Sequence, residues 1–263
     1  MSEAVSLIFS NTDYFVLVLF RVGGLVFTSP VFGRTQVPTK VKIGLSAALG
    51  YLLFVLLPPS AQLEYNSLLE FALICISELL IGIALAFVTN IFFALNFVAG
   101  QLIDMQIGFG IVNVYDPQNN TQIPMMGNLL NLIMLIVFFA VNGHYRLVQI
   151  VYIAADKLPV GNLVFSPNIG MVALEIFSMS FLLGVMVALP VIASALIIEI
   201  GFGALIRTVP QINMFVIGIP AKLLVGLIVM FFIIPVYINF TGGIFEELFM
   251  GIEKMFSTFV ASA

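Results

Sequence analysis

The sequence predicts an all-α, polytopic membrane protein, and its composition and the spacing of its apolar residues support this fold class. Of the 263 residues, 62% are hydrophobic and 8% are charged, and the mean hydropathy is +1.20. A soluble domain carries charge on roughly a quarter of its residues, so lipid or partner protein must cover much of this chain. Apolar stretches recur at 14–32, 43–57, 68–99, 125–155, 171–200 and 212–240.

The longest apolar runs are the strongest candidates for membrane helices. The charge-free runs at 79–99, 176–198 and 223–245 each reach the length of about 20 residues that a helix needs to cross a bilayer. The first two stretches are weaker, because Arg21 interrupts one and the other ends after a short run at Pro58. We expect these two stretches to form a helical hairpin that is not a pair of simple spans.

Three prolines lie inside the last two apolar stretches, at Pro190, Pro220 and Pro235. Proline lacks the backbone N–H that a helix interior uses, so it tends to bend or break a helix. We therefore expect bent or broken helices here. Freed carbonyl groups in lipid need protein or water as partners, so these helices should be surrounded by other helices.

Ionisable residues also lie within or beside the apolar stretches, where an unpaired charge costs about 3 kcal/mol. They are Arg21, Glu78, Asp104, Glu175, Glu199, Arg207 and Lys222. Acids and bases nearly balance, so pairing between helices is the simpler interpretation and ion transport is the alternative. We expect Arg207 and Lys222 to pair with Glu199 or with carboxylates of partner subunits.

The third stretch places its polar residues on one face of a helix. At 100° per residue, an arc of about 140° contains Glu78, Thr89, Asn90, Asn96, Gln101 and Asp104, together with Gly82 and Gly100. The opposite face is apolar. Small residues on the polar face favour close contact between helices, which indicates a packed interface. A face that lines a water-filled lumen is the alternative.

The motifs of a catalytic or metal centre are missing from the sequence. It has one histidine, His144, and one cysteine, Cys75, whereas a metal site or a proton relay needs several such side chains. No glycine-rich phosphate loop is present. The net charge of −4 is spread thinly, so no basic patch indicates nucleic acid. We therefore expect no enzymatic activity, no catalytic residue, no metal and no cofactor.

A short sequence match between two parts of the chain, called the sequence echo below, leaves a different class of function open. VPTKVKIGL at Val37–Leu45 matches IPAKLLVGL at Ile219–Leu227 in its proline, lysine, glycine and final leucine. Repeats and proline-interrupted helices are typical of secondary transporters. Nine residues do not establish a duplication, so chance similarity is the simpler explanation.

Several longer motifs follow Arg21 in a fixed order. They are SPVFGRTQVPTKVKIGL at Ser29–Leu45, AGQLIDMQIGFG at Ala99–Gly110, DP at Asp116–Pro117, VNGHYR at Val141–Arg146 and RTVPQINMFVIGIPAKLLVGL at Arg207–Leu227. Together they resemble the FliR family, the flagellar member of the export-gate proteins of type III secretion. The resemblance covers about residues 10–240. Its most specific part is the last motif, which combines Pro210, Gln211, Asn213 and Pro220 at fixed spacing.

The resemblance implies a non-enzymatic subunit of the export gate in the bacterial inner membrane, at the flagellar basal body. In that family, one such subunit assembles with several copies of FliP and FliQ, and with FlhB, around a pore for unfolded flagellar proteins. Its hairpins belong to a larger helical assembly that stands largely clear of the membrane plane. The chain would be one export-gate domain (1–263) with an N-terminal segment (1–13) and a short C-terminal tail (241–263). The injectisome counterpart is a close relative and stays open as an alternative.

The connection at 104–123 joins two apolar stretches but does not itself suit lipid. It carries glycines and polar residues that cannot continue a helix smoothly, among them Gly108, Gly110, Asp116 and Pro117. Irregular backbone at membrane depth is tolerated where protein buries it or where it lines a wet cavity. The resemblance implies that this loop closes the pore, with an apolar stopper formed by Met105, Ile107, Phe109 and Ile111. An ordinary exposed loop is the alternative.

Overall fold

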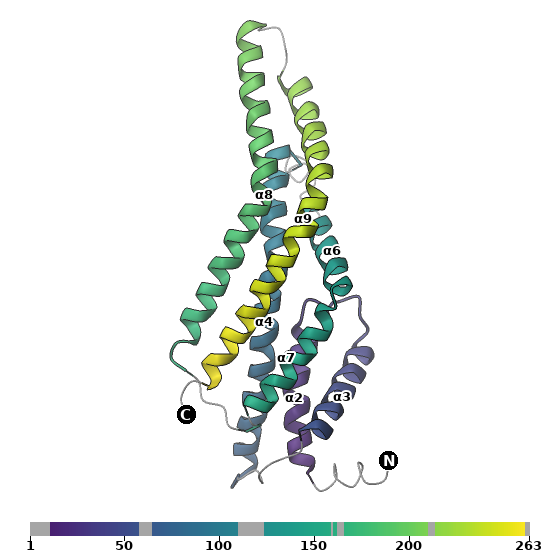
Figure 1. Cartoon of the computed structure of the whole chain (residues 1–263), viewed down its shortest axis with the longest axis vertical. Helices are drawn as coiled ribbons and strands as arrows, with labels where there is room; N and C mark the ends of the chain where they lie inside the picture. The colour runs from purple at the N-terminus through teal and green to yellow at the C-terminus, as the bar shows by residue number, and fades with distance from the viewer. Residues whose placement is uncertain are drawn as a thin grey trace. The chain divides into compact units, whose positions relative to one another are not determined.

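The computed structural model describes residues 11–57, 65–109, 124–158, 160–161, 166–209 and 214–260. Within these residues the regular secondary structure is helical, without a strand (Figure 1). The helices are α2 (Thr12–Thr28), α3 (Thr39–Leu56), α4 (Leu68–Ile107), α6 (Met125–Ala140), α7 (Gly143–Lys157), α8 (Ile169–Thr208) and α9 (Met214–Val260). The predicted all-α class is confirmed.

The chain divides into two compact units. The first comprises Met1–Ile91, Asn142–Ile176 and Glu247–Ala263, and the second comprises Phe92–Val141 and Phe177–Glu246. Helices α4, α8 and α9 therefore contribute residues to both units. Helices α2, α3 and α7 belong to the first unit, and α6 belongs to the second.

In the first unit, α2 and α3 form the helical hairpin that the sequence predicts (Figure 1). Helix α2 ends because Ser29 precedes a proline and adopts an extended conformation with ψ of 140°, as residues before proline do. At the other end of the hairpin, the Tyr14 hydroxyl donates a hydrogen bond to the carbonyl oxygen of Leu57 at 3.0 Å. The rings of Phe15 and Phe54 meet edge to face beside it.

The fourth apolar stretch was predicted as one segment at 125–155, and this prediction is wrong because the stretch forms two helices, α6 and α7. The chain leaves helical geometry at Asn142, whose φ of 58° is left-handed. Asparagine adopts this conformation more readily than most residues. Gly143 then begins α7. An Asn-Gly pair is typical of a helix break, but the stretch was predicted as one segment because its hydropathy is high throughout.

Three helices are longer than predicted. Helices α4 and α8 have 40 residues each, which corresponds to about 60 Å of straight helix at 1.5 Å per residue. Helix α9 has 47 residues and continues to Val260. The segment 241–263, predicted as a C-terminal tail, is therefore helical over most of its length.

The prolines predicted to bend or break the last two segments do not interrupt them. Pro190 lies inside α8, and Pro220 and Pro235 lie inside α9. Each proline removes one backbone donor, but the helix continues on both sides. The helices are therefore not broken at these three positions, and of the bent or broken helices that the sequence predicts only bent ones remain.

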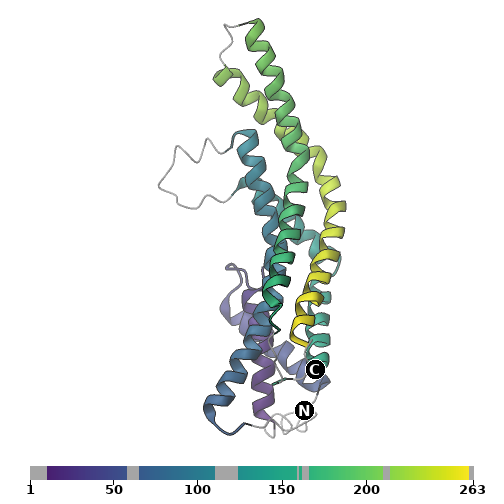
Figure 2. The same ribbon diagram turned by 90° about the vertical axis from the view of Figure 1, so that its left-hand side faces the viewer.

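In the second unit, the C-terminal part of α8 and the N-terminal part of α9 run side by side in opposite directions (Figures 1 and 2). Phe138 of α6 contacts Phe93 of α4 and Phe245 of α9, with ring centroids 5.6 and 5.3 Å apart. Both contacts are edge to face, a geometry that contributes about 0.5–1.5 kcal/mol beyond the burial of area. These rings join three helices of the unit.

Four of the described helices are long and apolar enough to cross a membrane: α3, α4, α8 and α9. Helices α6 and α7 add a fifth candidate if together they form one bent span. Large apolar side chains remain exposed on these helices, with Ile200 at 74%, Phe231 at 71% and Phe232 at 70%. Soluble monomers rarely expose apolar patches of this kind. The chain is a polytopic membrane protein.

Candidate functional site

Most polar residues predicted to share one face of α4 are buried against other helices. Glu78, Thr89 and Asn96 are fully buried and Asp104 is 5% exposed, whereas Gln101 is exposed. Each of the four buried side chains has a hydrogen-bond partner within the chain. These four side chains are therefore packed inside the chain, which is the arrangement that the interface interpretation expects.

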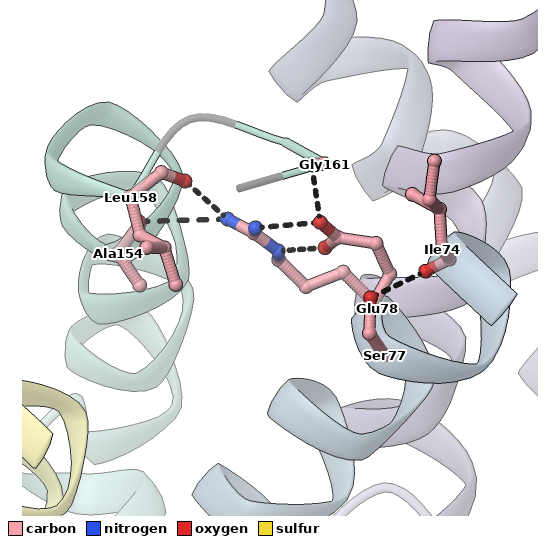
Figure 3. Close-up of polar contacts among 7 residues, drawn as sticks. Ile74, Ser77, Glu78, Ala154, Leu158 and Gly161 are labelled. Atoms are coloured by element: carbon pink, nitrogen blue, oxygen red, sulfur yellow. Dashed lines mark hydrogen bonds and ion pairs between the residues drawn. The ribbon is translucent and has the colours of Figure 1, made fainter. Parts of the chain in front are cut away.

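Arg21 of α2 and Glu78 of α4 form a buried ion pair in the first unit (Figure 3). Arg21 Nε donates to Glu78 Oε2 at 2.5 Å, and Nη2 donates to Oε1 at 3.1 Å, so the contact is bidentate. Burying either charge alone costs several kcal/mol. The paired arrangement offsets that cost, because charge-assisted bidentate hydrogen bonds are stronger than hydrogen bonds between neutral groups.

The other polar atoms of this pair bond the end of α7 and the residues that follow it (Figure 3). Arg21 Nη1 donates to the carbonyl oxygens of Leu158 at 3.0 Å and Ala154 at 3.5 Å. Glu78 Oε1 accepts from the Gly161 backbone N–H at 2.8 Å. The last carbonyls of a helix lack partners within it and attract cations. Arg21 and Glu78 therefore hold α2, α4 and α7 together.

A second buried network joins α4, α6 and α9 in the second unit. The Tyr237 hydroxyl donates to Asn96 Oδ1 at 2.6 Å. Asn96 Nδ2 donates to Met134 Sδ at 2.8 Å and to the Phe93 carbonyl oxygen at 3.2 Å. Tyr237 was not among the predicted residues, because a tyrosine in an apolar stretch is equally typical of a membrane-surface anchor.

Asp104 of α4 stabilises the first turn of α6. Its two carboxylate oxygens lie 3.3 and 3.4 Å from the backbone nitrogen of Met126. Pro124 occupies the position before α6 and makes no side-chain cap. Asp104 therefore replaces the capping side chain that aspartate or serine would supply there, with its charge at the positive end of the helix dipole.

Glycines on the polar face bring α4 into backbone contact with its neighbours. A Cβ atom on Gly82 would overlap the carbonyl oxygen of Arg21 in the first unit. A Cβ atom on Gly100 would overlap the backbone of Gly127 in the second unit. These are the close approaches that small residues allow between membrane helices.

The remaining charged residues of the prediction are less buried. Lys222 pairs with Glu199 across the α8–α9 hairpin. Their side chains are 18% and 43% exposed, so both remain accessible to a charged group of another subunit. Arg207 is exposed and makes no ion pair with a described residue. Glu175 pairs with Lys254 at 2.5 Å, which ties the start of α8 to the end of α9.

The two copies of the sequence echo lie in different surroundings. Pro38 precedes the first residue of α3, whereas Pro220 lies inside α9. A Cβ atom on Gly44 would face open space, whereas one on Gly226 would meet the side chain of Ile107. Equivalent positions of a structural repeat share their surroundings, so the echo does not indicate a duplication.

The loop predicted to plug the pore begins later than the sequence suggests. Helix α4 runs through Met105 to Ile107, and Ile107 is fully buried beside Gly226, so it packs within the chain. Gly108 follows with φ of 96°, a left-handed conformation that glycine adopts without steric cost at a helix end. Met105 is 65% exposed, and Phe109 is half-buried.

Other predicted residues lie outside the described residues. In the loop they are Gly110, Ile111, Asp116 and Pro117, and in the last motif they are Pro210, Gln211 and Asn213. Pro220, the last residue of that motif's pattern, lies in α9.

Within the described ranges, no group of three or more histidine, cysteine, aspartate or glutamate residues is placed to hold a metal ion. Cys75 is buried. His144 lies in the first turn of α7, with its ring edge to face against Tyr145. The polar groups collected along α4 join helices to one another, which is a structural arrangement.

The chain is similar to proteins of one family over nearly its whole length. The family described as bacterial export proteins, family 1, matches residues 13–248. The flagellar biosynthetic protein FliR of Escherichia coli is 32% identical over 232 residues, which are 88% of each chain. The protein of that name from Bacillus subtilis is 31% identical over 82% of this chain and 84% of its own. That of Aquifex aeolicus is 28% identical over 94% and 93%. The chain therefore belongs to the FliR family of bacterial export proteins.

Proposed function

We propose that the chain is a non-enzymatic subunit of the flagellar type III protein export gate in the bacterial inner membrane. There it forms part of the pore through which unfolded flagellar proteins cross. Membership of the FliR family and the several apolar helices make it a membrane component of flagellar export. The finer proposal is supported by the contrast between polar groups that are satisfied within the chain and apolar faces that the chain leaves uncovered.

The length of the uncovered faces favours protein partners as well as lipid. Exposed large apolar side chains occur along α8 from Met171 to Leu205, within a helix of 40 residues. The hydrocarbon core of a bilayer covers about 20 residues of a helix. The remaining apolar surface needs protein, and we propose copies of FliP and FliQ, together with FlhB, as the subunits that cover it.

Expression without partner subunits should yield aggregated or degraded protein, because the exposed faces of α8 and α9 have no other cover. Co-expression with FliP and FliQ should yield one monodisperse complex in mild detergent. Size-exclusion chromatography and native mass spectrometry of the two preparations check this. A stable, monodisperse monomer from the chain expressed alone would contradict obligate assembly.

Two alternative functions make different predictions. A secondary transporter would move a solute or an ion when the purified chain alone is placed in liposomes. An injectisome subunit would fail to restore swimming in a flagellated strain that lacks its own FliR protein. The flagellar names of the relatives favour the flagellar system, so we expect swimming to be restored.

The loop that follows Gly108 is proposed to close the pore. Replacing 108–120 with a short glycine–serine linker should leave assembly intact. Helix α4 ends at Ile107, so the residues through which it packs are not replaced. The assembled complex should then conduct ions and small solutes. Single-channel conductance in planar bilayers measures this effect.

A matched control replaces the connection at 58–64 with a similar linker, which should leave conductance at the wild-type level. If the complex lacking 108–120 assembles normally and conducts no more than this control, the loop is a connector and not a plug.

A further inference from the structure

We propose that the loop end of the α2–α3 hairpin binds an anionic phospholipid, with the lipid phosphate at a basic cluster and an acyl chain in an apolar groove along α2. The basic cluster consists of Arg34, Lys40 and Lys42. The proposal depends on the first unit alone and is independent of any role in a pore.

The basic cluster carries charge that this part of the chain does not neutralise. Its three cations lie within nine residues, and residues 14–57 contain no acid. Asn90 Nδ2 donates to the Thr28 carbonyl oxygen at 2.6 Å, which places this part of α4 beside the end of α2. Between Glu78 and Asp104, α4 contains no acid either.

Two hydrogen bonds hold the cationic groups at the loop. Arg34 Nε donates to the Pro30 carbonyl oxygen at 3.0 Å, and Lys42 Nζ donates to the Gly33 carbonyl oxygen at 2.8 Å. Arginine has five N–H donors and lysine has three, so most donors of both groups stay available to a phosphate. Lys40 is exposed in the first turn of α3, two residues before Lys42.

An apolar groove begins at the same end of the hairpin. Its volume is about 310 Å³, and its lining includes Phe20, Gly23, Phe27 and Thr28 of α2 with Leu79 and Ile83 of α4. A Cβ atom on Gly33, the residue that accepts from Lys42, would overlap the carbonyl oxygen of Phe27. Gly33, which binds the Lys42 ammonium, therefore lies at the Phe27 end of α2, where the groove also ends.

A phospholipid matches both parts of this surface. Cations at the end of apolar membrane helices lie at the depth of the headgroups, and lysine and arginine there attract anionic lipids. Val41 and Ile43, on either side of Lys42, are 55% and 56% exposed, as expected for a segment at the membrane surface. A partner helix, about 10 Å wide, would fill the groove but would leave three cations to be neutralised separately.

The test compares lipids retained by the full chain, purified with any subunits that accompany it, in nanodiscs of equal parts phosphatidylglycerol and phosphatidylcholine. Lys40→Gln should lower the preference for phosphatidylglycerol about fivefold, the effect of one lysine near an anionic surface. Lys157→Gln, which removes an exposed lysine at the end of α7, should leave the preference unchanged. Native mass spectrometry counts both lipids.

A second variant tests the groove without changing charge. Nothing lies within 4 Å of a Cβ atom on Gly23, so Gly23→Leu fills the groove without disturbing helix contacts and should lower retention of both lipids. Equal preference in the two lysine variants, or unchanged retention in Gly23→Leu, overturns the site. Cross-linking of Gly23→Cys to a co-purified subunit would assign the groove to a protein and also overturn it.

Discussion

Replacing Glu78 with glutamine should remove most of the folded protein from the membrane. The substitution leaves the Arg21 guanidinium buried without a counter-ion, and breaking a buried pair in this way costs about 3–5 kcal/mol. Each 1.4 kcal/mol is a factor of about ten in an equilibrium, so the ratio of folded to unfolded protein should fall more than a hundredfold. Immunoblots of membranes, thermal unfolding of the purified protein and swimming assays check this result.

The exposed Lys254–Glu175 pair provides the matched control, because its nitrogen-to-oxygen distance is also 2.5 Å. Lys254→Gln should cost no more than about 1 kcal/mol, since exposed ion pairs contribute little. The double variant Arg21→Gln with Glu78→Gln should destabilise the fold less than Glu78→Gln alone, because it leaves no buried charge without a counter-ion. Equal losses from Glu78→Gln and Lys254→Gln would show that the buried pair does not stabilise the fold.

The polar face of α4 was predictable because it depends only on the spacing of residues within one segment. Glu78, Asn96 and Asp104 recur at helical spacing in one segment, so geometry alone puts them on one side. Their partners were not predictable. The carbonyl of Leu158 lies 137 residues from Arg21 in the sequence, and a backbone carbonyl has no residue type by which to recognise it.

The ends of the helices were predicted poorly because hydropathy treats any polar residue as a boundary. The third apolar stretch ends near Ala99, yet α4 continues to Ile107, and Asp104 is buried there against the start of α6. The segment after Phe240 contains several acids and was predicted as a tail. Its buried residues recur every three or four positions, at Ile244, Leu248, Ile252, Met255 and Phe259, which is the pattern of an amphipathic helix.

Gly100→Val should separate α4 from α6 and destabilise the second unit. A Cβ atom at this position would overlap the backbone of Gly127, and backbone atoms cannot rotate away as a flexible side chain can. Overpacking typically costs about 1–3 kcal/mol, and we expect the upper end of this range. The shift also moves α6 away from Asp104, one turn along α4, so the helix loses the carboxylate that caps its first turn.

Gly201→Val in α8 is the matched control, because nothing lies within 4 Å of a Cβ atom there. Both variants replace a helical glycine with the same β-branched residue, so the change in helix propensity is shared and the difference between them reports the contact with Gly127. The midpoint of thermal unfolding should fall for Gly100→Val and stay near the wild-type value for Gly201→Val, in the same detergent and with the same accompanying subunits. Equal shifts for the two variants would mean that α4 and α6 do not meet backbone to backbone, and that the glycine on the polar face of α4 is not a packing residue.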